Sequence, residues 1–211
     1  MDANFWNERW EQGQIAFHEG RPNGFLSRHA SRWSGSRRVL VPLCGKTEDL
    51  AHLASLGHDV VGVELSEIAG RAFFSEHALE PTETRTGPFL DLRANGVRIL
   101  VGDFFRATAE ILNAPNALYD RAAVIALPEE LRIRYVAHLK EILPSDFTGL
   151  LVTDEYDQSA MSGPPFSVVK TEVERLWSGV AVEEIDHGVA DFPKLRAAGI
   201  SGNERCYWLG R

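Results

Sequence analysis

The sequence has few cysteines, no long hydrophobic run and no excess of positive charge. Its two cysteines, Cys44 and Cys206, lie far apart, and neither belongs to a CxxC pair, which argues against a disulfide framework or a paired-cysteine metal site. The seven histidines are scattered, with no HExxH motif and no cluster with cysteine, which argues against zinc. We therefore predict two free thiols in a reducing compartment and no bound metal.

Membrane and nucleic-acid binding are disfavoured as well. No stretch approaches the roughly 18 consecutive apolar residues of a membrane span, and residues 1–14 lack the basic and apolar regions of a signal peptide. Asp and Glu number 30 against 22 Lys and Arg, a formal net charge of −8, whereas nucleic acids and anionic membranes attract positive charge. We expect a cytoplasmic protein of one domain, residues 1–211, and a monomer, because no long exposed apolar helix is evident.

The sequence does contain a regular alternation of strands and helices. Short apolar runs predict strands at residues 38–43, 59–64, 97–101, 119–126 and 149–153, and helical spacing predicts helices at 48–56, 67–77, 128–143 and 168–177. Two further strands, at 180–185 and 205–209, are expected at sheet edges. This alternation indicates an α/β fold with a parallel, doubly wound sheet. The Trp-rich residues 1–35 are expected to cover that sheet from outside.

Such sheets bind ligands beyond the carboxyl ends of their strands, so the residues that follow each strand are the candidates for a site. Gly45-Lys46-Thr47 resembles the end of a phosphate-binding loop, but Leu40 stands where that loop needs its first glycine. A dinucleotide fingerprint has three glycines in this turn, and only Gly45 is present. Nucleoside triphosphatases and nicotinamide oxidoreductases are therefore disfavoured. Cys44, with no histidine near it in the sequence, is interpreted as packing in the turn rather than as a nucleophile.

Acidic, aromatic and basic residues follow the other strands. Glu64 ends the second strand, where a carboxylate can accept hydrogen bonds from both hydroxyls of a ribose; a solvated strand-end carboxylate is the alternative. Asp103 and Phe104 are placed to bracket an adenine, and Arg121 is placed to meet an anionic group or to pair with Asp120. A ribose and base site without a pyrophosphate cradle indicates a nucleoside cofactor other than a dinucleotide. S-adenosylmethionine fits this description.

Several sequence blocks then occur in a fixed order along the chain. They are FWxxRWxxGxIxFH at residues 5–18, VPLCGKxxD at 41–49, GVELSE at 62–67, GDFF at 102–105, YDRAA at 119–123, ALP at 126–128 and GPPFSV at 163–168. Each block alone is weak, but the ordered set spans nearly the whole chain. Together they resemble the thiopurine S-methyltransferase family, and its bacterial members most closely.

The resemblance implies a class I methyltransferase fold, which is a Rossmann-like, seven-stranded, mostly parallel sheet with a C-terminal antiparallel hairpin, and it makes residues 1–35 a lid. It implies transfer of the S-adenosylmethionine methyl group to sulfur of small aromatic or heterocyclic thiols, and some bacterial members are associated with selenium or tellurium compounds. The cofactor-binding residues carried over by motif are Trp10, Leu43, Glu64 and Arg121, with Gly102 and Asp103 near the adenine, and the strand-end argument adds Gly45 and Phe104. Phe17 matches a position that lines both cofactor and acceptor, and Pro165 and Phe166 are also predicted to bind the acceptor. His18 is predicted beside them as a weak base, with a surface or capping histidine as the alternative.

Arg121 is also the predicted catalytic residue, because its cation can stabilise an acceptor thiolate. Lys46 is the weaker candidate for this role. Alternatively, Arg121 holds the cofactor carboxylate. Methyl transfer from a sulfonium is an in-line displacement that needs alignment more than acid–base machinery, which fits the absence of a persuasive triad. The chain departs from the family at Ala16, where many bacterial members carry glycine. It departs again at residues 154–156, whose two carboxylates are expected to repel anionic thiolates. Two other functions stay open: methylation of thiocyanate or halide, and a module that binds the cofactor without turnover.

Overall fold

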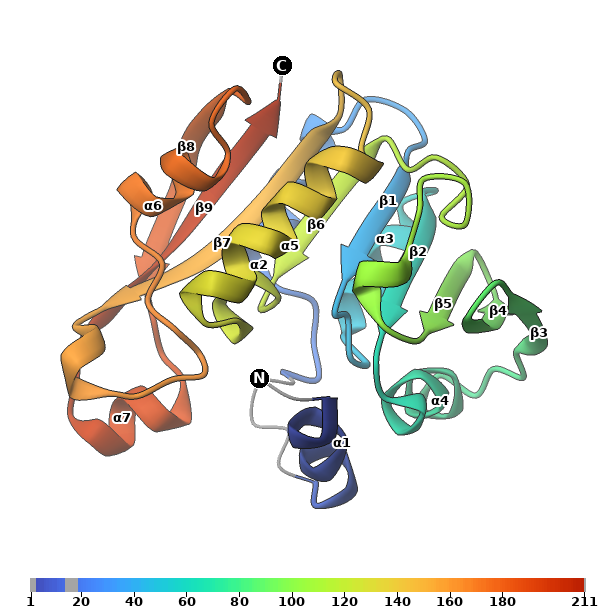
Figure 1. The fold of residues 1–211 in the computed structure, drawn as a ribbon, viewed down its shortest axis with the longest axis horizontal. Coiled ribbons are helices and arrows are strands. Elements are labelled where there is room, and N and C mark those ends of the chain that lie inside the picture. Colours follow the sequence, from blue (N-terminus) through green and yellow to red (C-terminus); the bar gives the residue numbers. More distant parts are fainter. Residues whose placement is uncertain (1–2, 14–18, 211) are drawn as a thin grey trace.

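The computed structural model describes residues 3–13 and 19–210, and its described strands form one nine-stranded sheet in the order β3-β4-β5-β2-β1-β6-β7-β9-β8 (Figure 1). The strands are β1 (Arg38–Pro42), β2 (Asp59–Glu64), β3 (Thr82–Thr86), β4 (Phe89–Ala94), β5 (Val97–Val101), β6 (Ala117–Arg121), β7 (Thr148–Tyr156), β8 (Val182–Val189) and β9 (Gly202–Gly210). The helices are α1 (Ala3–Glu11), α2 (Gly24–His29), α3 (Glu48–Ser55), α4 (Glu67–Glu76), α5 (Glu129–Ile142), α6 (Lys170–Leu176) and α7 (Pro193–Ala198).

The centre of the sheet is parallel and buried on both faces. Strands β5, β2, β1, β6 and β7 pair in parallel. On β1, Leu40 packs into the core cluster that contains residues of α5 and α6, while Val39 and Val41 pack into the cluster that contains residues of α2 and α3. Because each face has its own core, the strands read as nearly continuous apolar runs. The strand order reverses at β1, and a ligand crevice is expected at this switch point.

Three helices start at residues suited to a helix N-terminus. The Thr47 hydroxyl accepts the Asp49 N–H at the start of α3, and Ser66 accepts the Ala69 N–H at the start of α4. Pro128 precedes α5, whose first turn carries two glutamates. The predictions for these three helices are confirmed to within one residue at each end. Each helix therefore starts just beyond a strand end, where its N-terminus faces the crevice.

The sheet differs from the sequence expectation at its edges. β3 and β4 form a hairpin that extends the sheet by antiparallel pairing with β5, so the sheet is two strands wider than the seven implied. The sequence of β3, TETRT, lacks the apolar alternation that predicts a strand. The last two strands do form an antiparallel pair, but the expectation that both are edge strands is wrong, because β9 pairs with β7 on one side and β8 on the other.

Two further segments were not expected in their observed form. The predicted strand at 119–126 ends at Arg121, and Val124–Ala126 forms a 3-10 turn. Helix α7 is too short to give a periodic signal. Among the described residues, no helix is long and apolar enough to cross a bilayer.

Within residues 1–35, the described stretches 3–13 and 19–35 have different surroundings. Phe25, Leu26 and Trp33 are buried in the core on one face of the sheet, so α2 and the segment after it belong to the folded core. Helix α1 instead lies below the carboxyl ends of the central strands and beside α4 (Figure 1). Helix α1 is thus placed where a lid would lie, and α2 is not.

Candidate active site

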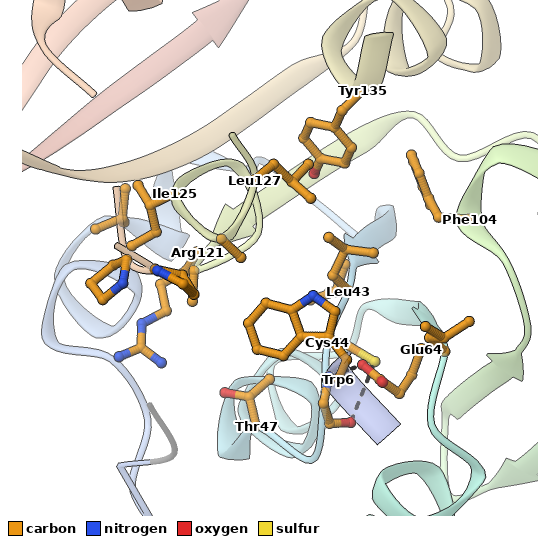
Figure 2. A pocket seen from close by; sticks show the side chains of 18 of the residues that line it. Trp6, Leu43, Cys44, Thr47, Glu64, Phe104, Arg121, Ile125, Leu127 and Tyr135 are labelled. Atoms are coloured by element: carbon orange, nitrogen blue, oxygen red, sulfur yellow. Dashed lines mark hydrogen bonds between the residues drawn. The ribbon is translucent and has the colours of Figure 1, made fainter. Parts of the chain in front are cut away.

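A cavity of about 550 Å³ opens at the carboxyl ends of the central strands. One half, which we call the β2 half, is formed by residues after β1, β2 and β5: Leu43, Cys44, Gly45, Glu64, Leu65, Asp103 and Phe104. The other, the β7 half, is formed by Arg121, Val152, Asp154, Pro164, Pro165, Phe192, Pro193, Lys194 and Glu204. Trp6 of α1 lies between Glu64 and Arg121 in Figure 2, and Trp10 also lines the wall. The volume is in the range of small-molecule and cofactor sites.

Most of the residues predicted from sequence meet in this cavity. Those that line it are Trp10, Leu43, Gly45, Glu64, Asp103, Phe104, Arg121 and Pro165. Gly102 does not line it, and a Cβ at that position would lie 2.7 Å from the Phe89 ring, so close packing explains its glycine. Phe166 does not line it either; its N–H donates to the Ile125 carbonyl at 2.6 Å and so anchors the loop that carries Pro164 and Pro165. Phe17, His18 and the departure at Ala16 lie outside the described residues.

The turn after β1 brings the backbone to the cavity wall. Leu43 and Gly45 both have positive φ, 46° and 54°, and for Leu43 this is a strained conformation of the kind found at functional sites. Cys44 packs against Gly62, where a Cβ would lie 2.6 Å from its sulfur. Burial, with Glu64 nearby, raises the pKa of the Cys44 thiol well above its usual value, so the thiol stays protonated. These contacts support the interpretation of Cys44 as a packing residue.

Glu64 is a buried carboxylate with two backbone partners. It is 5% exposed, and its oxygens accept the N–H of Gly45 at 2.7 Å and the N–H of Ser66 at 2.8 Å. Burial raises the pKa of Glu64, while the backbone N–H groups that reach it counteract that rise. Each carboxylate oxygen has two lone pairs. Glu64 can therefore hold the two turns in place and still accept hydrogen bonds from a ligand in the cavity.

Arg121 does not pair with Asp120, because neighbouring strand residues point to opposite faces. Its guanidinium forms an ion pair with Glu19, which comes from the segment before α2. Burial lowers the pKa of Arg121, but the charges of Tyr119, Glu19, Asp49 and Glu204 outweigh that effect and raise it. The guanidinium is thus a permanent cation, 15% exposed, that already holds a carboxylate.

Asp120 has a structural role on the other face. Its carboxylate accepts the Tyr135 hydroxyl at 2.8 Å and the Val124 N–H at 3.1 Å, which links β6, the following turn and α5. Burial raises the pKa of Asp120 to about 6.

The two carboxylates noted at residues 154 and 155 have different surroundings. Glu155 forms an ion pair with Arg205 and does not line the cavity. Asp154 lines it, is 5% exposed, and lies directly opposite Glu204 in the β7–β9 register. Burial, reinforced by Glu204 and Glu19 and opposed by Arg121, raises the pKa of Asp154 to about 7. The β7 half thus contains an acidic pair, Asp154 and Glu204, together with the cations of Arg121 and Lys194.

Sequence reasoning missed several residues of the wall. Asp49 accepts the Asn23 N–H at 2.7 Å, the Tyr119 hydroxyl at 2.9 Å and the Thr47 hydroxyl at 3.0 Å, which fixes the segment before α2 to the turn after β1. Asp49 and Trp6 stand inside quoted sequence blocks, so those blocks were the available signal. Lys194 and Glu204 come from segments without a motif, and only the fold brings them to the cavity. Among the described residues, no group of three His, Cys, Asp or Glu side chains is arranged to hold a metal.

Comparison with known proteins gives one consistent result. Residues 1–210 match the family model described as Thiopurine S-methyltransferase (TPMT). The chain is similar to the thiopurine S-methyltransferase of Pseudomonas aeruginosa strain UCBPP-PA14, with 49% identity over 89% of this chain and 88% of that protein. It is similar to the enzyme of the same name from Pseudomonas syringae pv. tomato, with 44% identity over 100% of this chain and 99% of that protein.

Solved structures show the same fold at low identity. The Burkholderia thailandensis 1,6-didemethyltoxoflavin-N1-methyltransferase, with bound 1,6-didemethyltoxoflavin and S-adenosylhomocysteine, superposes with a TM-score of 0.66, at 15% identity over 99% of this chain and 87% of that chain. The magnesium protoporphyrin IX methyltransferase of Synechocystis PCC 6803, with bound S-adenosylhomocysteine, gives 0.65 at 11% identity, and all of both chains is covered. These neighbours identify the fold as that of class I S-adenosylmethionine-dependent methyltransferases.

Proposed function

The chain belongs to the thiopurine S-methyltransferase family and uses S-adenosylmethionine as its methyl donor, and from that premise we propose that it methylates the sulfur atom of small aromatic or heterocyclic thiols. The observation that carries the proposal is the single cavity with two chemically different halves. Its β2 half has the groups that a nucleoside needs, and its β7 half combines apolar rings with the charged side chains of Arg121, Lys194, Asp154 and Glu204. A donor and a flat acceptor can therefore lie end to end in one cavity.

The residues of the β2 half fit the cofactor. Glu64 accepts the two ribose hydroxyls with the lone pairs that its backbone partners leave available. Leu43 and Gly45, in their positive-φ turn, let the backbone approach the ligand closely. Asp103 and Phe104 line the wall where the adenine lies, one as a hydrogen-bond acceptor and the other as an apolar ring. Lacking a glycine-rich cradle, this half suits a nucleoside without a pyrophosphate.

Arg121 is assigned two anionic partners. Its ion pair with Glu19 demonstrates that a carboxylate fits against this guanidinium, and the cofactor's carboxylate is the matching group of the ligand. A guanidinium has five N–H donors in a planar fork, so one side chain can contact both a carboxylate and negative charge on the acceptor's sulfur. Arg121 is thus the group that couples the two halves of the cavity.

Bound S-adenosylmethionine supplies a methyl group on a positively charged sulfur, which is activated for in-line displacement. The chain's own contribution is alignment and the exclusion of water. Trp6 and Trp10 of α1 close the wall between the halves, and Pro164, Pro165 and Phe192 give the acceptor an apolar surface. An acceptor ring held between these surfaces presents its sulfur toward the β2 half.

The test is transfer of labelled methyl from S-adenosylmethionine to a panel of acceptors: 6-mercaptopurine, thiophenols, thiocyanate, iodide, selenite and tellurite. Methylation of the aromatic and heterocyclic thiols supports the proposal. Activity confined to thiocyanate and iodide would replace it with an anion methyltransferase that uses Arg121 as the anion site. Activity on selenite or tellurite in addition to thiols would extend the acceptor range to the chalcogen compounds that the resemblance to bacterial members implies.

A further inference from the structure

Asp154 is a buried carboxylate that faces the cavity and has no hydrogen-bond partner in residues 3–13 and 19–210. The side chain belongs to the cavity wall near the carboxyl end of β7, and the residue is 5% exposed. Its backbone carbonyl accepts the Val168 N–H at 2.8 Å, so the strand is held here without help from the carboxylate. The neighbouring Glu155 forms its ion pair with Arg205 away from the cavity. A carboxylate that has no protein partner and opens onto a cavity from a nearly buried residue is a candidate for a functional group.

The groups around Asp154 come from every element packed against it. Glu204 lies opposite on β9, Arg121 faces it from β6, and Glu19 approaches from the segment before α2. Tyr156, two residues along on β7, donates its hydroxyl to the Pro165 carbonyl at 2.5 Å. Lys194 of α7 also lines this half, and its ammonium group donates a hydrogen bond to the Pro164 carbonyl at 2.7 Å. Burial and two nearby carboxylates against one guanidinium hold the pKa of Asp154 near neutrality, where a side chain can both take up and release a proton.

We propose that Asp154 is the proton acceptor for a neutral acceptor thiol bound in the β7 half, and that the acidic pair Asp154–Glu204 selects protonated acceptors over ionised ones. This inference rests on the proposed thiol methyltransferase function. As the acceptor's sulfur forms its bond to the methyl carbon, the bond between that carbon and the cofactor's sulfur breaks and leaves its electron pair there. The proton of the acceptor's S–H group passes to a carboxylate oxygen of Asp154 and later to solvent.

The charge balance of the β7 half explains why the acceptor enters protonated. Asp154, Glu204 and Glu19 lie around the Arg121 guanidinium, and Lys194 adds a second cation whose ammonium donates to the Pro164 carbonyl. Three carboxyl groups therefore oppose the entry of a thiolate into the β7 half, and two cations favour it. A neutral thiol meets no such repulsion. Once its proton has moved to Asp154, one carboxylate charge is removed and Arg121 is left to stabilise the sulfur.

The experiment compares Asp154→Asn with wild type on two acceptors that differ in ionisation. At pH 7, phenylmethanethiol is protonated and 4-nitrothiophenol is ionised. We expect the variant to lose at least about 100-fold in kcat with phenylmethanethiol, in line with the usual contribution of a general base. That loss should shrink about tenfold for each pH unit toward the pKa of the thiol. With 4-nitrothiophenol kcat should stay within about threefold, because no proton has to be removed. Its KM should fall, because the variant lacks one of the carboxylates that oppose the thiolate.

Two further variants and a binding measurement make the result specific. Glu155→Gln removes a carboxylate charge at the neighbouring residue, outside the cavity, and should leave kcat with both acceptors unchanged. Glu204→Gln removes the like charge beside Asp154, so the pH at which activity on phenylmethanethiol is half-maximal should move to lower values. Titration with S-adenosylhomocysteine should give the wild-type affinity for Asp154→Asn, which shows that the fold and the cofactor half are intact.

Equal loss on both acceptors, or no loss on either, would overturn the inference while leaving the proposed function in place. Absence of transfer to any thiol by the wild-type enzyme, with cofactor binding intact, would overturn the proposed function and with it the inference. The two failures are thus distinguished by the wild-type measurement alone.

Discussion

At the scale of single residues, Glu64 joins local structure to ligand binding. The same carboxylate fixes the turns after β1 and β2 through the N–H groups of Gly45 and Ser66 and lines the cavity. A substitution at this residue is therefore expected to change two measurable quantities, the cofactor affinity and the free energy of unfolding.

We predict that Glu64→Gln weakens S-adenosylhomocysteine binding by about 1–3 kcal/mol, because a charge-assisted contact to the ribose is lost. Glu64→Ala should do the same and also lower the free energy of unfolding, since two buried N–H groups lose their acceptor. Calorimetric titration and urea unfolding measure the two effects. Glu67→Gln, on the exposed side of α4, is the matched control. An unchanged titration for Glu64→Gln would remove this residue from the cofactor site.

The two proposed duties of Arg121 predict different kinetics. If Arg121 stabilises the acceptor's sulfur, Arg121→Ala lowers kcat by roughly 10–100-fold at saturating cofactor and acceptor, as expected for a hydrogen bond to a charged group. If it holds only the cofactor carboxylate, the cofactor KM rises and kcat at saturation stays near wild type. Steady-state kinetics separate the two outcomes. Arg71→Ala, whose ion pairs with Glu67 and Glu83 are exposed, should change neither constant.

At the scale of elements, an ion-pair cluster attaches the β3–β4 hairpin to the parallel sheet. Asp91 on β4 is fully buried and accepts hydrogen bonds from Arg98 on β5, Arg93 on β4 and Thr86 on β3. Burial alone would raise the pKa of Asp91, but these hydrogen bonds outweigh it and hold the pKa well below its usual range. The hairpin is thus joined to the sheet by a charge network as well as by backbone pairing.

We predict that Asp91→Asn lowers the free energy of unfolding by about 3–5 kcal/mol at pH 7, because Arg98 is left buried without its counter-charge. The folded pKa lies below the unfolded value of about 3.9, so the stabilisation is complete above that value and is lost as the pH falls through the folded pKa. The difference between wild type and variant should accordingly shrink from pH 7 toward pH 2 in urea unfolding. Glu83→Gln, an exposed partner of Arg71, should leave the midpoint unchanged, and an equally large loss there would contradict the argument.

The same elements show which features the sequence can and cannot predict. β1, β2 and β5 are buried on both faces, so their apolar runs are local signals, and the strand-end rule then locates Glu64 and Asp103. Arg121 ends β6, whose predicted strand extended too far, to residue 126. β3 is polar and is fixed by its partner strand, and α7 is too short to be periodic, so neither leaves a pattern. The position of β9 and the meeting of Asp154 with Glu204 depend on long-range pairing, which composition and spacing do not contain.

At the scale of the whole molecule, the surface is acidic and its apolar residues are dispersed. The exposed large hydrophobic residues in the described part of the chain lie on different segments: Leu56, Ile68, Ile133, Val169 and Val189. Single exposed apolar residues are ordinary on a monomer, and a contiguous patch is what marks an interface. The net charge of −8 adds mutual repulsion between copies.

We therefore predict a monomer of 23.5 kDa in solution. Size-exclusion chromatography with light scattering measures the mass directly, and the value should hold in both low and high salt. High salt screens the repulsion between copies, so a mass that doubled only there would show a weak apolar interface. Twice the mass under all conditions would contradict the prediction.

The place of β9 between β7 and β8 determines when the sheet is completed during synthesis on the ribosome. Translation adds about 5–20 residues each second, in order from the N-terminus, so residues 202–210 emerge after every other strand. Until then β7 has an open edge and β8 has no neighbour, and open edges are templates for aggregation. When β9 pairs with β7 and β8, it covers those edges and also brings Glu204 into the cavity wall. Chaperone shielding therefore matters most between the synthesis of β7 and that of β9.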